Sequence, residues 1–310
     1  MKKKLLILGI LPLLALSSCG RGAKIEEEKA KDIASAIHTY NTKAEGAEDS
    51  PSGLDYQGFD MVLNIEGTSG EGTEKKTDSL KYKLTVNQDD ETRFEGHGTD
   101  GDEKIDFLLI VATPEKSEQK MNYLRYYDNT TKEDVEFVIP NGTTGNKEYN
   151  NYSMQMLIPA LMMAKFMDPE PLMQKEKEND EGETVINGDY LFDYDSLDEA
   201  KDYEEKWEFY SNGDQNLTIV ASNEYKGTQT EFAEETTLNE SYEITYNKLI
   251  IKSAKYTVKS SLGNVIKMSI NVSAKKNAFK IDLPSGWEKK ILPDSSIPVT
   301  SSEPESSSVA

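Results

Sequence analysis

Apolar and polar residues alternate along much of this chain, and this period of two constrains its fold more than any other feature. Between residues 59 and 65, and again between 80 and 86, every second side chain is apolar. Because successive side chains of a β-strand point to opposite faces, the pattern predicts strands with one buried face. Turn sequences at 100–102 and 212–214, each with a central glycine, favour antiparallel hairpins between neighbouring strands.

Two stretches lack this period and predict helices. Residues 24–44 place Ile33 and Ile37 on one helical face and gather acids at the start, where the helix dipole favours them. Residues 149–173 are apolar nearly all round and predict one or two buried helices that end at Asp168-Pro169. The predicted strands span residues 59–65, 80–86, 105–112, 121–127, 135–139, 185–194, 207–210, 217–221, 242–246, 254–258, 266–272 and 279–283.

These elements predict a β-rich α+β fold, in which helices cover a curved antiparallel sheet, a half-barrel. We expect four regions along the chain. Residues 1–18 form a signal peptide and 19–53 an anchor, the N-terminal helix and a linker. Residues 54–292 form the sheet domain with its helical insertion at 149–173. Residues 293–310 are rich in serine, proline and acids, and are expected to be a disordered tail.

The N-terminus has the layout of a bacterial lipoprotein signal. Three lysines precede a short apolar run from Leu5 to Leu16, and Ser17-Ser18-Cys19 follow. This ending resembles the lipobox, which implies a diacylglycerol group on the Cys19 sulfur and cleavage before it. The acyl chains would hold the protein on the extracytoplasmic side of the cell membrane. An ordinary secretory signal or an uncleaved anchor are the alternatives.

The acidic composition excludes one class of partner. Cleavage removes three lysines and no acid, which takes the net charge from −21 to −24. Nucleic acids require clusters of Lys and Arg, and no consecutive basic run follows the signal. Cys19 is the only cysteine, so no intramolecular disulfide forms. We therefore expect no nucleic acid partner and a fold stabilised by its core alone.

The residues offer little for catalysis, metals or cofactors. His38 and His97 are the only histidines, and they are far apart in the sequence, so no zinc site, catalytic residue or cofactor is predicted. Acids at 100–106 and 193–198 leave calcium open, although neither stretch matches a calcium-binding loop. We accordingly expect a non-enzymatic protein.

The methionine-rich segment at 149–173 has two interpretations. Met and Phe side chains fill irregular apolar space, so the segment is either plain core or the wall of a cavity for an apolar ligand. The candidate lining residues are Met156, Leu157, Leu161, Met163, Phe166 and Met167.

The order of a lipobox, an amphipathic helix, antiparallel strands, an apolar helical insertion and further strands resembles lipoprotein carriers of the LolA and LppX/LprG families. That resemblance implies an apolar cavity between sheet and helices that binds a lipid. The alternative is a cell-surface structural or interaction lipoprotein without a small ligand, whose partner is another envelope protein. The sequence leaves the ligand, the partner, the oligomeric state and the number of host membranes open.

Overall fold

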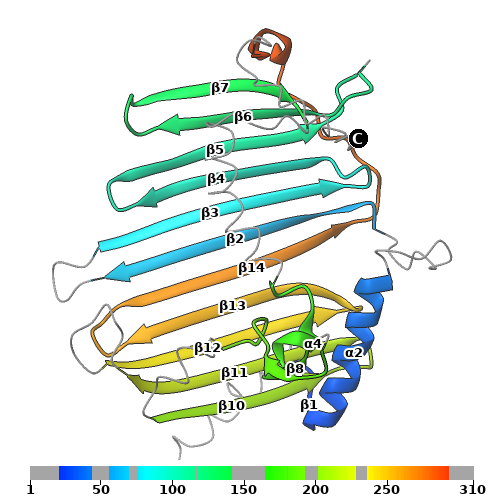
Figure 1. Cartoon of the computed structure of the whole chain (residues 1–310), viewed down its shortest axis with the longest axis vertical. Coiled ribbons are helices and arrows are strands. Elements are labelled where there is room, and N and C mark those ends of the chain that lie inside the picture. Colours follow the sequence, from blue (N-terminus) through cyan, green and yellow to red (C-terminus); the bar gives the residue numbers. More distant parts are fainter. Residues whose placement is uncertain are drawn as a thin grey trace, which may run out of the picture. The chain divides into compact units, whose positions relative to one another are not determined.

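The structure is a computed structural model (Figure 1). It describes residues 21–43, 56–69, 76–115, 117–141, 165–179, 181–192, 202–227 and 236–292. The chain divides into two compact units. Unit 1 consists of residues 1–53, 64–77 and 162–272, and unit 2 of residues 54–63, 78–161 and 273–310.

Antiparallel strands dominate the described residues. Twelve of them follow one hydrogen-bonded order, β1-β10-β11-β12-β13-β14-β2-β3-β4-β5-β6-β7, with β1 and β7 at the two edges. The predicted half-barrel covered by helices is therefore wrong, because the strands form a large open sheet and the described α-helices are only α2 and α4. Neighbouring strands are mostly consecutive in sequence, since each hairpin adds the next strand to the growing edge.

Unit 1 holds the strands at the β1 end of this order. They are β1 (Ala23–Ile25), β10 (Asp202–Ser211), β11 (Asn216–Gly227), β12 (Thr236–Asn247), β13 (Ile250–Ser260) and most of β14 (Val265–Lys275). A separate two-stranded sheet pairs β8 (Glu176–Glu178) with β9 (Thr184–Ile186).

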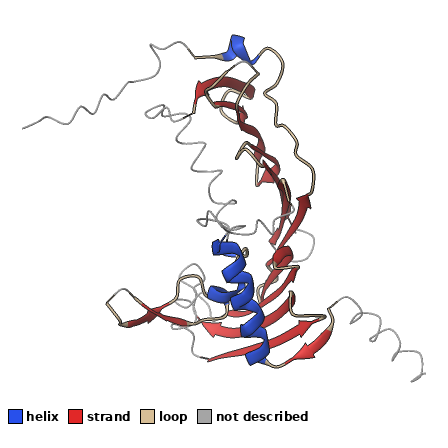
Figure 2. Cartoon of the chain, turned by 90° about the vertical axis from the view of Figure 1, so that its right-hand side faces the viewer, coloured by secondary structure: helices blue, strands red, loops and turns tan. Residues whose placement is uncertain are grey.

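Helices cover one face of unit 1. Helix α2 (Glu27–Lys43) buries Ala30, Ile33 and Ile37 and packs against β10, β11 and the short helix α4 (Pro169–Leu172). Figure 2 shows α2 lying along one side of the strands. The predicted helix at 24–44 is confirmed, except that its first residues form β1. No helix within the described residues is long and apolar enough to span a membrane.

Unit 2 is a meander of hairpins. Its strands are the first part of β2 (Gly58–Ser69), most of β3 (Lys76–Asn87), β4 (Thr92–Asp100), β5 (Glu103–Ala112), β6 (Met121–Asp128) and β7 (Glu133–Pro140). The C-terminal residues 276–292, called the strap below, return over one face of these strands and end in the 3-10 helix η2 (Trp287–Lys290).

The predicted strand at 279–283 is wrong. Phe279, Ile281 and Leu283 do alternate toward an apolar cluster on β5, β6 and β7, but the segment lies on the sheet and not within it. Its alternation reflects burial of every second side chain by an extended segment without strand pairing. The predicted strand at 185–194 is reduced to β9, because a turn begins at Asn187.

Candidate functional site

An open cavity of about 670 Å³ lies in unit 2 between strands β2–β4 and the beginning of the strap. Small-molecule sites commonly measure about 300–1,000 Å³, so this volume suits a ligand. One wall comes from a single face of the sheet, because Asp60, Thr85 and Arg93 lie side by side on successive strands. The other wall is the chain from Lys275 to Asp282.

Basic side chains predominate around the cavity. The lining contains five of them, Lys83, Arg93, Lys275, Lys276 and Lys280, against two acids, Asp60 and Asp282. The whole chain has a net charge of −21, so the excess of positive charge here runs against the composition. An anion would therefore be attracted to this cavity and repelled from most other surfaces.

Two of the basic residues already have acidic partners. Lys275 Nζ lies 2.6 Å from Asp60 Oδ2, and the Thr85 hydroxyl donates to Asp60 Oδ1 at 2.8 Å. Burial opposes ionisation of Asp60, but these two bonds outweigh it and lower the pKa of the carboxyl. Arg93 donates to Glu95 at 2.9 Å. Among the described residues, Lys83, Lys276 and Lys280 have no ion-pair partner, so they are available to a ligand.

Apolar groups of the strap complete the cavity. Phe279 and Ile281 line it and also pack on the cluster of β5, β6 and β7, in which Ile110 and Val138 are fully buried. The site thus offers an apolar surface next to cationic ends. Such a combination suits an amphiphile with an anionic head.

A buried polar group fixes the strap over the sheet. Glu91 is only 7% exposed, and its carboxylate accepts from Asn87 Nδ2 and from the backbone N–H groups of Thr113 and Ile281. Asn87 Nδ2 also donates to the Phe279 carbonyl at 3.1 Å. At the far end, Leu292 N–H donates to the Val138 carbonyl. These contacts hold the strap in place without strand pairing along residues 278–284.

Most of the residues predicted as an apolar wall lie outside the described residues. These are Met156, Leu157, Leu161 and Met163. Phe166 is described and 4% exposed, its ring centroid lies 6.4 Å from that of Tyr242, and its carbonyl accepts from the Tyr246 hydroxyl at 2.9 Å. Met167 is half-buried. Cys19 and the rest of the signal also lie outside the described residues.

Phe166 belongs to a continuous aromatic layer of unit 1. Its other members are Tyr190, Phe192, Trp207, Phe209, Tyr242 and Tyr256, with ring centroids 4.7–6.4 Å apart. Tyr190 and Trp207 both donate to Glu205 Oε2. Burial raises the pKa of Tyr256, which donates to Glu240. Packing of this kind stabilises a core.

The two histidines have separate structural roles. His38 Nδ1 on α2 lies 2.5 Å from Asp168 Oδ2, and Asp168 Oδ1 caps helix α4 at Glu170 N–H. Pro169 therefore starts a helix, where the sequence predicted that it ends one. His97 Nδ1 lies 3.2 Å from Asp106 on the neighbouring strand. Within the described residues, no three His, Cys, Asp or Glu side chains are arranged to hold a metal ion.

A basic feature escaped the sequence prediction. Between Glu243 and Asp282 the chain contains eight lysines and no acidic residue. Apart from the adjacent Lys275 and Lys276, the lysines are spaced along the turn before β13, β13 itself, β14 and the strap, so they form no longer run. A charge count in a sliding window would have found the stretch.

Comparison with known proteins gives only distant similarities. No family model and no curated protein matches this chain. The structure of a DUF1329 family protein from Desulfovibrio piger is 10% identical, with a TM-score of 0.24 over 84% of this chain and 95% of that one. An outer membrane lipoprotein-sorting protein domain from Vibrio parahaemolyticus is 9% identical, with a TM-score of 0.22 over 82% and 95%.

A LolA superfamily protein from Nitrosomonas europaea is 11% identical, with a TM-score of 0.17 over 84% of this chain and 98% of that one. These likenesses are low in both identity and TM-score. The function of this chain has to be inferred from its own residues.

Proposed function

We propose that this chain is a non-enzymatic, lipid-anchored protein of the extracytoplasmic envelope that binds an anionic amphiphile in the cavity of unit 2. The observation that carries the proposal is the cavity itself, which combines the apolar side chains Phe279 and Ile281 with three lysines that have no ion-pair partner among the described residues, in a protein of net charge −21. A phosphate or carboxylate head would contact the lysines, and an acyl or aromatic portion would lie against the strap.

The anchor is the second part of the proposal. Acylation of Cys19 would retain the protein at the membrane, where amphiphilic ligands are concentrated. The six residues of the methionine-rich segment are a second proposed apolar wall, of which Phe166 and Met167 are described in unit 1. If they line a lipid site, Met163→Glu removes a copurifying lipid while the sheet stays folded. If they are core, the same change unfolds the unit.

The cavity is tested with monomeric short-chain lipids. The mature chain carrying Cys19→Ser is titrated with dihexanoyl phosphatidylglycerol and with dihexanoyl phosphatidylcholine, which share their tails and differ in net charge. Binding is measured by calorimetry. We expect preference for the anionic lipid, and the double variant Lys276→Glu/Lys280→Glu should lose at least about tenfold in affinity, or about 1.4 kcal/mol.

A matched control keeps the overall charge change the same. Lys29→Glu/Lys31→Glu alters two exposed lysines of α2 in unit 1 and should leave the affinity unchanged. Equal loss in both double variants would mean that only net charge matters. If the chain with Cys19→Ser and its natural lysines bound neither lipid, the alternative would be favoured, an interaction lipoprotein without a small ligand. Crosslinking would then identify its protein partner.

A further inference from the structure

Strands β13 and β14 carry lysines on an exposed face and no acid at all. Lys255, Lys259 and Lys267 are exposed, and neither strand contains Asp or Glu. Strand pairing places them together, because Lys267 is opposite Thr257, which lies between Lys255 and Lys259 on the same face of β13. We call these three residues the lysine face.

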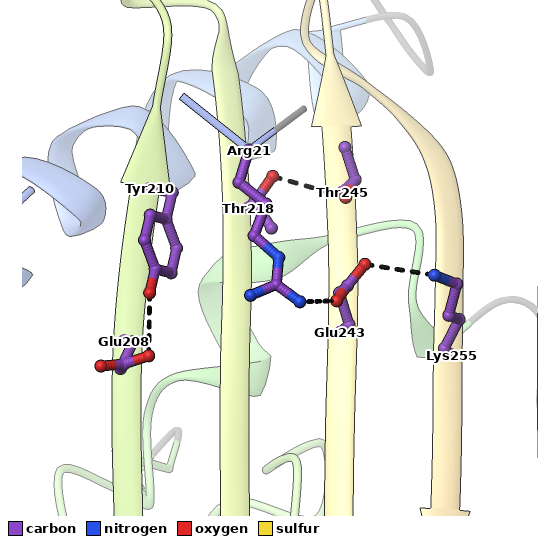
Figure 3. A network of polar contacts seen from close by, with 7 residues as sticks. All are labelled: Arg21, Glu208, Tyr210, Thr218, Glu243, Thr245 and Lys255. Atoms are coloured by element: carbon purple, nitrogen blue, oxygen red, sulfur yellow. Dashed lines mark hydrogen bonds and ion pairs between the residues drawn. The ribbon is translucent and has the colours of Figure 1, made fainter. Parts of the chain in front are cut away.

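The N-terminal segment is fastened beside the lysine face. The Arg21 guanidinium bonds to Glu243 on β12, and Glu243 also accepts from Lys255 Nζ at 3.3 Å. Figure 3 shows the Arg21 side chain crossing β11, which carries Thr218, to reach Glu243. The same guanidinium lies 5.8 Å from the centre of the Tyr210 ring. Arg21 thus contacts β12 and β10 and crosses the strand between them.

These contacts also neutralise the acids nearest to Arg21. Burial opposes ionisation of Glu243, but the bonds from Arg21 and Lys255 outweigh it and lower its pKa. Glu208 accepts from Lys24 at 2.8 Å and from the Tyr210 hydroxyl at 2.8 Å, and both bonds lower its pKa. Each of these two acids is therefore ionised and matched by a cation.

The covalent distance from Arg21 to the proposed anchor is short. Only Gly20 separates Arg21 from Cys19. Two residues span at most about 7 Å even when fully extended. An acyl chain on Cys19 would therefore enter the membrane close to Arg21 and not at the end of a long tether.

From this placement we propose that the lysine face lies against the anionic headgroups of the membrane that holds the anchor. This inference rests on the anchoring part of the proposed function but not on the cavity of unit 2. The net negative charge of the chain opposes approach only at long range, because salt screens charges beyond about 8–10 Å. At contact, each lysine near an anionic surface contributes about 1 kcal/mol.

The first test uses the natural acylated chain in vesicles. A water-soluble acetylating reagent is applied in phosphatidylglycerol/phosphatidylcholine vesicles and in pure phosphatidylcholine vesicles, and each lysine is followed by mass spectrometry. We expect several-fold slower acetylation of Lys259 and Lys267 in the anionic vesicles only. Lys29 and Lys31 on α2 should react equally in both. Equal reaction of all four lysines in both vesicles would overturn the proposal.

The second test removes the anchor and isolates the electrostatic contact. The mature chain with Cys19→Ser is floated with the same two vesicle types. It should bind the anionic vesicles, and Lys259→Glu/Lys267→Glu should weaken that binding at least about tenfold, since two lysine contacts are lost. Lys29→Glu/Lys31→Glu is the control with the same charge change. Equal loss in the control would contradict a specific face.

The outcomes separate this inference from the proposed function. Lys276→Glu/Lys280→Glu should lose binding of the monomeric lipid and keep binding of vesicles, whereas Lys259→Glu/Lys267→Glu should do the reverse. If the mass of the Cys19 peptide shows no acyl group, the anchoring proposal fails, while flotation of the unmodified protein still decides whether the lysine face binds a membrane.

Discussion

The aromatic layer of unit 1 and the cavity of unit 2 use apolar side chains over a sheet face in opposite ways. In unit 1, Phe192 is 1% exposed and its ring contacts Trp207 and Tyr242 edge-on. In unit 2, Phe279 is only half-buried and borders an open cavity. In unit 1, helices and aromatic rings cover the sheet face closely. In unit 2, a single extended strap leaves part of the sheet face accessible.

The largest effect should come from truncating a ring in the closed layer. Phe192→Ala removes a fully packed side chain and should lower the free energy of unfolding by about 3–5 kcal/mol. Phe279→Ala should cost about half of that or less, because its ring is partly hydrated already. Urea unfolding of both variants measures the two values. A larger loss for Phe279→Ala would show that the strap, and not the aromatic layer, is the better packed cover.

An intermediate effect should come from the contact that fixes the strap. Glu91→Gln keeps the shape of the side chain but leaves one acceptor oxygen for three donors, and buried hydrogen bonds to charged groups are worth about 1.5–3 kcal/mol each. We expect a loss of about 2 kcal/mol in stability, faster amide exchange at Ile281 and weaker binding of the anionic lipid. The exposed Glu118→Gln is the control. Unchanged exchange at Ile281 would show that other contacts hold the strap.

The sequence predicted strands best where apolar side chains alternate, and it missed β4, in which glycine replaces a side chain. Strand β4 was not predicted, because Gly96 occupies a position on the buried face. A Cβ there would lie 2.4 Å from the Phe107 ring, so the aromatic neighbours leave room only for glycine. The reason for a glycine at position 96 is visible only once β5, which carries Phe107, is known to pair with β4.

The cavity could not be predicted from the sequence for a related reason. Its walls join β2–β4 with a segment that begins about 190 residues later in the chain, as the bond between Asn87 and Phe279 shows. The alternation at 279–283 predicted burial correctly but not the absence of strand pairing. Which lysines meet at one place depends on that return of the chain, and no local pattern encodes it.

The smallest effect concerns how α2 and α4 are joined in unit 1. The hydrogen bond to Asp168 raises the pKa of His38 above its ordinary value of 6.5, in spite of partial burial. A group whose pKa is raised by folding stabilises the protein fully below its unfolded pKa, and this contribution is lost as the pH rises through the folded pKa. The contact between the two helices should therefore weaken from neutral toward alkaline pH.

Urea unfolding and an NMR titration of the imidazole between about pH 5 and about pH 9 would measure this loss. His38→Gln should flatten the decline, because the amide can still bind Asp168 but does not ionise. His97→Gln, which alters the only other histidine, should leave it in place. Because the side chain of His38 is 39% exposed, solvent screens the interaction and the change should stay well below that of Glu91→Gln. If the part of the free energy of unfolding that depends on His38 rose with pH instead, the hydrogen bond assigned between His38 and Asp168 would be contradicted.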